Sequence, residues 1–527
     1  MRFRPSVLIL LFLVSAFSAE AQERQIRDFH FTLDTTLALQ MGNPAALSSW
    51  KGHVSMAEVT GKKENGALIP VEGSPDCVSI LAGTESFYRI SDRVVFHGKL
   101  SWSDFIGKEM GGQVLMAPAF HPVNFLESDE STTGVKKREM YQLVGDVSFQ
   151  LGERWSVGFG IDYGAGDQTK VKDPRFSDIR MDMDLKAGMA FHPSPDLLLG
   201  LVLQYRNVMD QVRGGVYGTT DQQYYVDTDK GGFFGIVEIL SGDNNYMPAS
   251  SYRPMDNRFY GIALQALVKQ RFSNELRFRY RDGYYGKKAT SSPVFFEFSG
   301  LEAEYEGVLL LGTSLDRHRV RGSASFAMLG NDENLLRYVT PAGQSTQVEY
   351  TGRNHILDRT DLDAALDYHW YHGLAGIRPE MTLGASASFF SRTQTTTIYP
   401  YYRNHSYRNV RADLSGQRVF TSAKSSFILD LAAEFNTGWG VEKEDGMLAS
   451  STSTNLKSFD NYLSRQFEYE TATHLGGIIS FTFARTMKGG FEPYLKLTDR
   501  FVSLLSEPQY LQGRFRNEAC IVLGCNF

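Results

Sequence analysis

Charged side chains that could bind a solute recur at every second position in four short stretches. The rows are Arg277, Arg279 and Arg281; Arg317, Arg319 and Arg321; Asp182 and Asp184; and Asp361, Asp363 and Asp367. Alternate side chains of a β-strand share one face, so each row places its charges on a single face. If these strands cross a bilayer, the charges should face the lumen, because an Arg or Lys facing lipid at mid-membrane costs about 2 to 4 kcal/mol. Two roles remain open: ladders of opposite charge that stiffen the wall, or a polar path with an anionic-ligand site near the arginines.

Motifs for catalysis or metal binding are missing from the sequence or poorly placed in it. The chain has no Gly-x-Ser-x-Gly elbow, no His-Glu-x-x-His helix and no phosphate-binding glycine loop. His369 and His372 lie near Asp367, and imidazole and carboxylate are common metal ligands. A separation of three residues, however, puts the two histidines on opposite faces of a strand, and the neighbouring Tyr368 and Trp370 fit an interfacial aromatic belt better. We therefore expect no enzyme activity, no bound metal and no cofactor.

The elements that would carry these rows are long strands with an alternation of period two. From Arg514 to Phe527 the side chains are apolar and largely polar in turn, and the run is long enough to cross a membrane obliquely. A strand of a soluble sandwich could alternate in the same way, but such strands average only about five or six residues. The hairpin made by Tyr141–Leu151 and Trp155–Tyr163 repeats the pattern, and aromatic residues end its apolar face, as in the girdles of membrane barrels.

Counting these runs predicts one all-β fold, a transmembrane antiparallel β-barrel with an even number of strands. Sixteen strands follow from Val94 onward; a further hairpin between His53 and Arg89 would give eighteen, and a range of about 14 to 18 covers the alternatives. The expected strands include Phe467–Ala484 near the end. Short and long connections alternate, with 104–140 and 437–466 among the long ones. Short turns should therefore lie on the periplasmic side and long loops outside.

A sheet in lipid must close on itself, because lipid offers no hydrogen bonds to a free edge. The last strand should therefore pair with the first. The composition also fits a single barrel, because the 527 residues include 13% aromatic residues and 49 Gly and show no break that would mark a second domain. A formal net charge of -6 and the absence of a basic cluster argue against a nucleic-acid partner.

The N-terminus predicts export. Residues 1–21 have a short basic head, an apolar run and a small-x-small site at Ala19-Glu20-Ala21, which is typical of a secretory signal peptide. No later apolar run approaches the roughly 18 residues of a spanning helix. We therefore divide the chain into a signal peptide (1–21), a polar and irregular N-terminal hatch or plug (22–50) and the barrel (51–527), located in the bacterial outer membrane among its lipids.

Two stretches resemble known families. Asn43-Pro44-Ala45, shortly after the signal peptide, resembles the N-terminal hatch of the long-chain fatty-acid transporter (FadL-like) barrels. The segment from Leu81 to Asp104 resembles outer-membrane barrels of uncharacterised function in the Bacteroidota. The terminal Phe527 resembles the aromatic signal that the barrel-assembly machinery reads, which makes that machinery an expected partner during biogenesis.

Three cysteines leave a disulfide question open. Cys520 and Cys525 are five apart on one expected strand, so they face opposite sides and do not pair with each other. All three thiols are free, or Cys77 and Cys520 form a bridge inside the barrel, which an oxidising compartment would permit.

These observations favour a passive, porin-like transporter or channel for a small solute, polar or amphipathic, that passes an N-terminal hatch. The residues expected at the lumen or ligand are Asn43, Pro44, Arg277, Arg279, Arg281, Arg319, Arg321, Asp361 and Asp363. The alternative is a surface-binding or secretion-partner barrel with a plugged lumen and functional loops. An outer-membrane enzyme would need a Ser or His with a base on an adjacent strand. An energy-coupled receptor is disfavoured because such barrels have about 22 strands around a separate plug.

Overall fold

The computed structural model describes most of the chain from Arg27 to Phe527. The described residues are 27–126, 130–219, 224–227, 236–240, 246–289, 292–313, 315–374, 377–398, 401–422, 424–446, 457–458 and 460–527. The expected signal peptide lies outside these residues.

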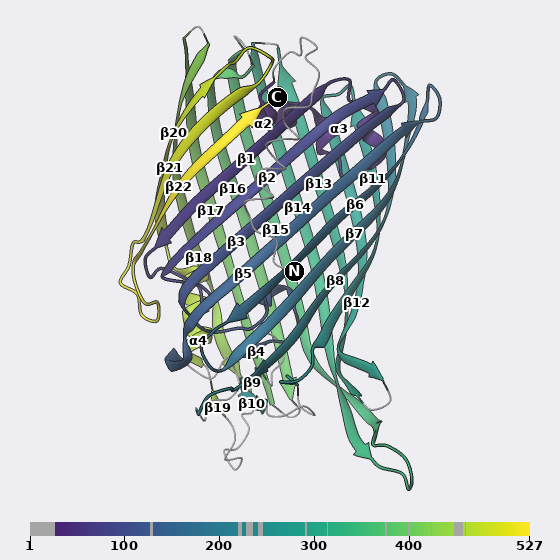
Figure 1. Cartoon of the computed structure of the whole chain (residues 1–527), viewed down its shortest axis with the longest axis vertical. Coiled ribbons are helices and arrows are strands. Elements are labelled where there is room, and N and C mark those ends of the chain that lie inside the picture. The colour runs from purple at the N-terminus through teal and green to yellow at the C-terminus, as the bar shows by residue number, and fades with distance from the viewer. Residues whose placement is uncertain are drawn as a thin grey trace.

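Eighteen antiparallel strands form one closed barrel (Figure 1). The strands are β1 (His53–Asn65), β2 (Asp76–Ser91), β3 (Val94–Met110), β5 (Gly134–Gln150), β6 (Trp155–Lys170), β7 (Arg175–Ser194), β8 (Leu197–Gly215), β11 (Arg253–Val268), β12 (Phe272–Ala289), β13 (Ser292–Gly312), β14 (Asp316–Val339), β15 (Gln347–Leu374), β16 (Pro379–Ile398), β17 (Tyr401–Ser422), β18 (Ser425–Asp445), β20 (His474–Arg485), β21 (Glu492–Leu504) and β22 (Phe515–Asn526). Strand β22 pairs with β1 from Met56↔Asn526 to Asn65↔Asn517, so the last strand meets the first as expected and no edge is left open.

The strand count corrects the sixteen that the alternation gave from Val94 onward. Strands β1 and β2 form the further hairpin, with Ala57 opposite Thr84, and both belong to the barrel wall. In β1 the polar run Gly61-Lys62-Lys63 interrupts the alternation, which is why sequence pattern alone marked it only as a possible strand. The fourteen strands of a FadL-like layout do not apply.

Side chains alternate between an apolar outer face and a polar inner face. In β22, Ile521 and Leu523 are more than half exposed on the outside. The neighbouring Asn526 instead accepts a hydrogen bond from the backbone N–H of Phe29, which lies inside the barrel (3.3 Å). The alternation read from the sequence thus predicts the inner and outer faces correctly.

None of the described helices is both long and apolar enough to span a bilayer.

The two ends of the barrel differ. Strand β7 ends at Ser194 and β8 begins at Leu197, a short turn at the end where β1 starts and β22 stops. At the opposite end β3 stops at Met110, and β5 begins only at Gly134. A small sheet of β4 (Phe125–Leu126), β9 (Tyr224–Asp227), β10 (Ile236–Leu240) and β19 (Lys457–Ser458) lies at this second end (Figure 1).

One expected strand is partly helical. The stretch Phe467–Ala484 contains the end of α4 (Asp460–Thr471) as well as strand β20. The helix packs under the β1–β2 turn, where Nη2 of Arg465 donates to the carbonyl of Val71 (3.2 Å). This tertiary contact explains why a local period-two pattern did not locate the boundary.

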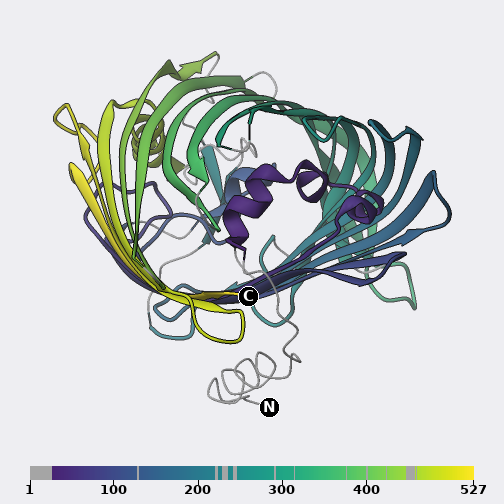
Figure 2. The same ribbon diagram turned by 90° about the horizontal axis from the view of Figure 1, so that it is seen from above.

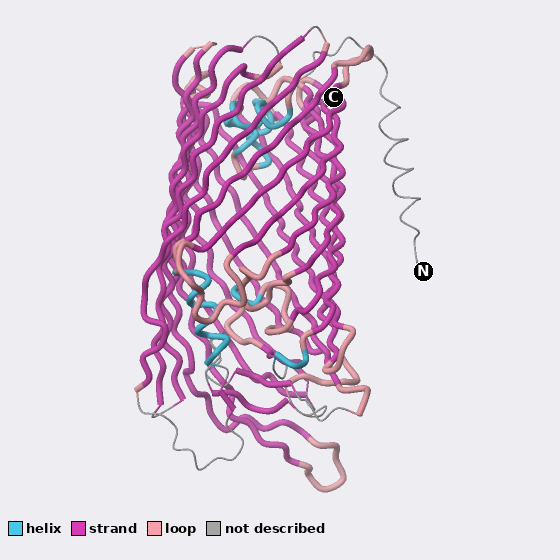
Figure 3. The backbone as a smooth tube through the Cα atoms, turned by 90° about the vertical axis from the view of Figure 1, so that its left-hand side faces the viewer, coloured by secondary structure: helices cyan, strands magenta, loops and turns pink. Residues whose placement is uncertain are grey.

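The N-terminal segment, residues 27–50, is helical and lies inside the barrel, whereas the sequence suggested an irregular stretch. It contains α2 (Phe29–Thr35), α3 (Leu37–Gln40) and the 3-10 turn η1 (Pro44–Ser49). Asp28 caps α2 by accepting from the N–H of Phe31 (2.9 Å). Figure 2 shows these short helices within the ring of strands, and Figure 3 shows helical turns in the lumen toward both ends.

Candidate functional site

Pro44 and its neighbours lie in a groove of the barrel wall that is floored by glycine. A Cβ added at Gly158 would lie 2.5 Å from the backbone nitrogen of Ala45, and one added at Gly160 would lie 3.0 Å from Cγ of Pro44. A Cβ at Gly188 would overlap the side chain of Asn43. The groove crosses neighbouring strands β6 and β7, so only a wall without side chains here lets the turn approach the backbone.

Polar contacts hold this turn in place. Asn43 accepts from the N–H of Ala45 (2.9 Å) and donates through Nδ2 to the carbonyl of Met189 on the wall (3.2 Å). The carbonyl of Ala45 accepts from the hydroxyls of Ser148 (3.1 Å) and Ser156 (3.0 Å), both of which are buried. The turn therefore docks chiefly through backbone atoms and one amide side chain.

Apolar contacts seal the segment on both sides of the turn. Leu37, Ala45 and Ala46 pack with Leu198 and Leu267 of the wall. A second cluster joins α2 and the end of the segment to β1, β2 and β3, and consists of Phe29, Leu39, Leu47, Trp50, Val54, Phe87 and Val95. This burial fixes the segment to the inner side of the wall at the end where β1 starts.

Charged side chains of the wall contact the N-terminal segment. Nε of Arg378 lies 3.1 Å from Asp28, and its Nη2 contacts Glu492. Nη2 of Arg319 donates to Gln40 (3.3 Å). Arg319 and Arg378 are both nearly fully buried, so the lumen contributes paired charges rather than bare ones to this end.

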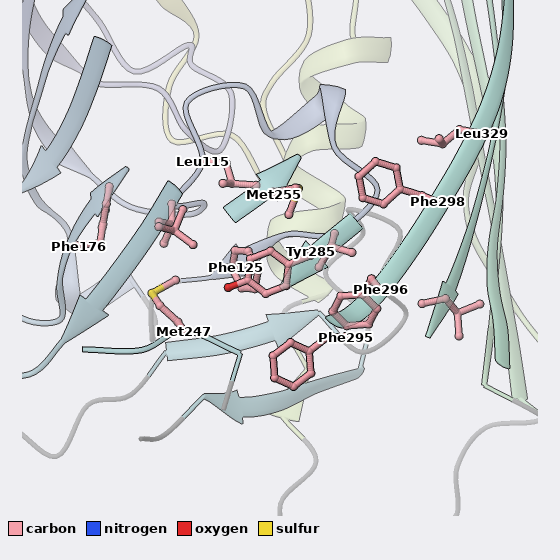
Figure 4. Close-up of a cluster of buried hydrophobic side chains, with 14 residues drawn as sticks. Leu115, Phe125, Phe176, Met247, Met255, Tyr285, Phe295, Phe296, Phe298 and Leu329 are labelled. Carbon is pink, nitrogen blue, oxygen red and sulfur yellow. The ribbon is translucent and has the colours of Figure 1, made fainter. Parts of the chain in front are cut away.

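A second segment enters the barrel from the opposite end. Residues 111–126, here called the inward loop, follow β3 and place Val114, Leu115 and Phe125 in a buried cluster with wall residues (Figure 4). Its other members are Val123, Phe176, Val212, Met247, Met255, Tyr285, Phe295, Phe296, Phe298, Leu329 and Ile356. The sequence placed this stretch among the long external loops, but its apolar side chains fold back between the strands.

The tip of the inward loop meets a group of arginines. The carbonyl of Phe120 accepts from Nη2 of Arg281 (3.0 Å) and Nη2 of Arg359 (3.4 Å). The guanidinium of Arg281 also lies 4.3 Å from the centroid of the Phe120 ring, within cation–π range. The tip is thus fixed by both its backbone and its aromatic side chain.

His121 is fully buried beside the tip, with Nε2 2.9 Å from Oδ2 of Asp210. The pKa of His121 is lowered because burial disfavours the imidazolium, and Arg180 and Arg281 add to that effect. Asp210 acts in the opposite direction but does not outweigh burial. The imidazole is therefore neutral when the loop is docked at neutral pH.

A polar chamber lies along the inner face of the wall and is lined by residues of β1, β2, β3, β5, β6, β7, β8 and β12. Its volume is about 710 Å³, and its lining includes Lys99, Asp162, Arg180, Asp182, Arg206 and Arg279. A smaller space of about 350 Å³ runs beside α2, lined by Asp34, Tyr371 and Lys496 among others. Glu58 lines both spaces, so they adjoin in the lumen.

The first row of predicted arginines divides between these features. Arg277 and Arg279 line the chamber. Arg279 pairs with Glu302 through Nε (2.8 Å) and also contacts Glu304, whereas Arg281 reaches the inward loop instead. The row shares one face of β12, as the alternation predicts, but its members have different partners.

The other predicted charges are spread along the wall. Nη1 of Arg319 lies 3.0 Å from a carboxylate oxygen of the adjacent strand β15, and Arg321 pairs with a carboxylate of β13 (2.8 Å). Asp361 binds a guanidinium of β16 through two bonds (2.7 and 2.9 Å). Asp363 makes no hydrogen bond or ion pair with the residues that the structure describes. Most of these pairs are cross-strand ladders, and they do not converge on one point.

The two histidines lie on opposite faces of one strand, and the cysteines form no disulfide. His369 contacts Asp367 (3.0 Å) on one face of β15, and His372 contacts Asp316 (2.6 Å) on the other, as their spacing predicts. The thiols of Cys77, Cys520 and Cys525 are all free, so the bridge considered between Cys77 and Cys520 does not form here.

Sequence reasoning missed Arg359 and Arg392, which belong to no alternating row of arginines, and it missed the inward loop. A signal was present, because Val114, Leu115 and Phe125 make this connection unusually apolar for an exposed loop. Loops exposed to water carry few such residues, and a cluster of them predicts burial.

Solved structures with a similar arrangement are bacterial barrels. The ferric preacinetobactin receptor BauA of Acinetobacter baumannii has 6% identity and a TM-score of 0.41, with 90% of this chain and 80% of that chain covered. A FadL homologue of Pseudomonas aeruginosa has 11% identity and a TM-score of 0.28, covering 92% and 93%. The toluene transporter TbuX of Ralstonia pickettii has 9% identity and a TM-score of 0.27, covering 92% of each chain. At such distances these likenesses say nothing of what this chain carries.

A comparison with curated proteins returned no match. A family model, by contrast, matches residues 44–527, which contain the whole barrel and the Pro44 turn. The chain therefore belongs to the family described as "Family of unknown function (DUF6850)".

Proposed function

We propose that the protein is a passive outer-membrane transporter of a small polar or amphipathic solute, with one chain segment inserted into the lumen from each end. The observation that carries the proposal is the polar chamber of about 710 Å³ on the inner wall of the barrel. Charged residues such as Asp182 and Arg279 line it beside the apolar Leu81 and Met140. A wall of this kind suits a solute with both polar and apolar parts better than a purely apolar one.

The outer surface supports a position in a membrane. Large apolar side chains are exposed all around the barrel, and water would solvate such a surface unfavourably. Examples on different strands are Phe159, Leu203, Leu264, Leu301, Leu366, Leu414, Leu431, Ile479 and Leu523, each more than half exposed. A lipid bilayer would cover them, and the closed sheet leaves no backbone edge to be satisfied. The proposal includes export by the N-terminal signal peptide and insertion by the barrel-assembly machinery.

In this proposal the N-terminal segment acts as the hatch, with Asn43 and Pro44 at its docking point. At the glycine floor the segment contacts the wall through backbone atoms of the turn and through the side chains of Asn43 and Pro44. Such a contact can open without rearranging the barrel, because the cross-strand pairs of the wall do not depend on it.

Single-channel conductance in planar bilayers tests this function. Refolded protein that begins at Gln22 would be compared with the same chain lacking residues 22–50 and with a control lacking only residues 22–26. We expect the larger deletion to raise conductance well above that of the other two forms, because it removes the closure at one end. A deletion of the hatch that leaves conductance unchanged would contradict the proposed role.

The second candidate is a binding or secretion-partner barrel with a permanently plugged lumen. The apolar cluster around Phe125 and Tyr285 favours it, because a loop buried to this extent is costly to move. This candidate predicts silence of the full-length protein and of the form that lacks residues 22–50, because the inward loop still fills the lumen.

A further inference from the structure

The three arginines at the tip of the inward loop share a single carboxylate. Arg392 binds Asp361 through two bonds (2.7 and 2.9 Å), and Nε of Arg359 lies 3.5 Å from the same side chain. Arg281 has no carboxylate within ion-pair distance among the described residues; its wall partner is the neutral amide of Asn257. The three guanidinium groups therefore have one carboxylate, Asp361, within ion-pair distance among the described residues.

Burial makes this imbalance unfavourable. Arg281 is 4% exposed and Arg359 is 7% exposed, so water does little to stabilise their charge. Two further carboxylates act on the group without pairing with it: Glu302 is bonded to Arg279 (2.8 Å), and Glu470 lies 3.7 Å from Arg411. Buried charge without a partner of opposite charge is destabilising, and proteins keep such groups mainly where function requires them.

Neutral oxygens of the chain itself now occupy the place of the missing charge. The carbonyls of Ala119, Phe120 and His121 accept from the three arginines at 3.0 to 3.5 Å. A carboxylate, phosphate or sulfate would bind the same donors more strongly, because charge-assisted bonds are about twice as strong as neutral ones and the planar guanidinium matches two oxygens at once.

We propose that Arg281, Arg359 and Arg392 form a binding site for the anionic group of a solute, and that the Ala119–His121 tip is a displaceable occupant of that site. An anion that takes the place of the carbonyls releases the tip from the wall. Arg180 lines the chamber and lies 5.6 Å from the centroid of the Phe120 ring, so the tip borders the chamber and its release widens the chamber on that side. This inference rests on the proposed transport function and adds to it the chemical class of the solute, an oxyanion or carboxylate.

The test measures binding without requiring transport. Succinate is titrated calorimetrically into detergent-solubilised full-length protein, and its uncharged diamide serves as the matched neutral probe. Phe120→Ala removes the ring that lies against Arg281 and so weakens the competing tip. We expect Phe120→Ala to bind succinate at least tenfold more tightly than the unmodified protein, and neither form to bind the diamide.

A second substitution locates the site. Arg359→Gln in the Phe120→Ala background should abolish the gain, because Arg359 bonds all three carbonyls of the tip. Arg500→Gln is the control, since Arg500 has its own carboxylate partner, Glu434 (2.9 Å), and should keep the gain. Succinate affinity that is indifferent to Phe120→Ala, or a gain that survives Arg359→Gln, would overturn the inference.

Conductance distinguishes a failure of this inference from a failure of the proposed transport function. If the protein binds succinate as expected but shows no conductance in bilayers, even without residues 22–50, the anion site is supported and the transport function is contradicted. If the protein conducts after deletion of the hatch but binds no succinate in any form, only the anion site is contradicted.

Discussion

A Cβ on Gly158 would lie 2.5 Å from the carbonyl carbon of Pro44, closer than real side chains approach a backbone. The N-terminal segment therefore docks where the wall offers only backbone, and Gly160, Gly188 and Gly200 extend the same surface. This close approach brings the carbonyl of Ala45 within hydrogen-bond distance of the hydroxyls of Ser148 and Ser156. A contact of this kind is specific in shape and limited in strength, which is what a movable closure requires.

Substituting Gly158 should weaken the docking. Gly158→Ala forces η1 away from the wall, at a cost of about 1 to 3 kcal/mol for an overpacked site. Hydrogen exchange of residues 43–49 should become faster, and openings in bilayers more frequent. Gly164→Ala is the matched control on the same strand and face, because its Cβ would meet nothing closer than 3.7 Å. Equal behaviour of the two variants would show that the groove does not hold the segment.

The two wall serines should contribute separately to the docked state. Ser148→Ala with Ser156→Ala removes two donors to the carbonyl of Ala45. At about 1 kcal/mol for a bond, and because Ser48 still donates to the same carbonyl (3.0 Å), the docked state should lose about 1 to 2 kcal/mol, or roughly 5- to 30-fold in population. Open probability in bilayers measures the change. Ser480→Ala breaks a comparable bond to Thr498 on the wall (2.8 Å) and should have no effect on opening.

Local pattern predicted what depends on local geometry. The faces of β12 and β22 and the opposite directions of His369 and His372 follow from the period of a strand alone. The same pattern undercounted the wall because Lys62 and Lys63 interrupt β1. The closure of the sheet was predictable because lipid forbids a free edge, whatever the number of strands.

The interior of the barrel was less accessible to prediction. Contacts such as Phe125 with Tyr285 (ring centroids 4.8 Å apart) join residues far apart in the chain, and no periodicity encodes them. The charged rows were correctly assigned to one face each, but their partners depend on the register between strands. Arg281 differs from Arg279 only by lying opposite Gly300 rather than Glu302, a fact that needs the paired sheet.

Acid should release the inward loop. Because the pKa of His121 is lowered in the docked loop, the docked state is fully stable above the ordinary histidine pKa of about 6.5 and loses stability as the pH falls below it. Hydrogen exchange of residues 114–126 should therefore speed up between pH 7 and pH 5. His121→Gln should flatten this dependence, and an unchanged slope in that variant would contradict the assignment to His121.

The last residue should matter more for assembly than for the finished wall. The N–H of Phe527 donates to the carbonyl of Ser55 (3.0 Å), and the N–H of Ser55 donates to that of Phe527 (2.8 Å). Phe527→Ala keeps both bonds and removes only the ring. We expect lower yields of folded barrel in cells, measured by heat-modifiable gel mobility, and normal conductance after refolding in vitro. Equal yields in cells would argue against the ring as an assembly signal.

A reversible crosslink would decide whether the hatch must move. The hydroxyls of Ser48 in the N-terminal segment and Ser156 in the wall are 3.1 Å apart, so Ser48→Cys with Ser156→Cys places two thiols within reach of a disulfide. The three native cysteines would first be replaced by Ala, and Ser48→Cys alone is the control. Oxidation should abolish conductance and reduction should restore it, because the docked turn is then tied to β6. If conductance persists in the oxidised form, the solute passes through the space beside α2, which Asp34 and Lys496 line, while the segment stays in place.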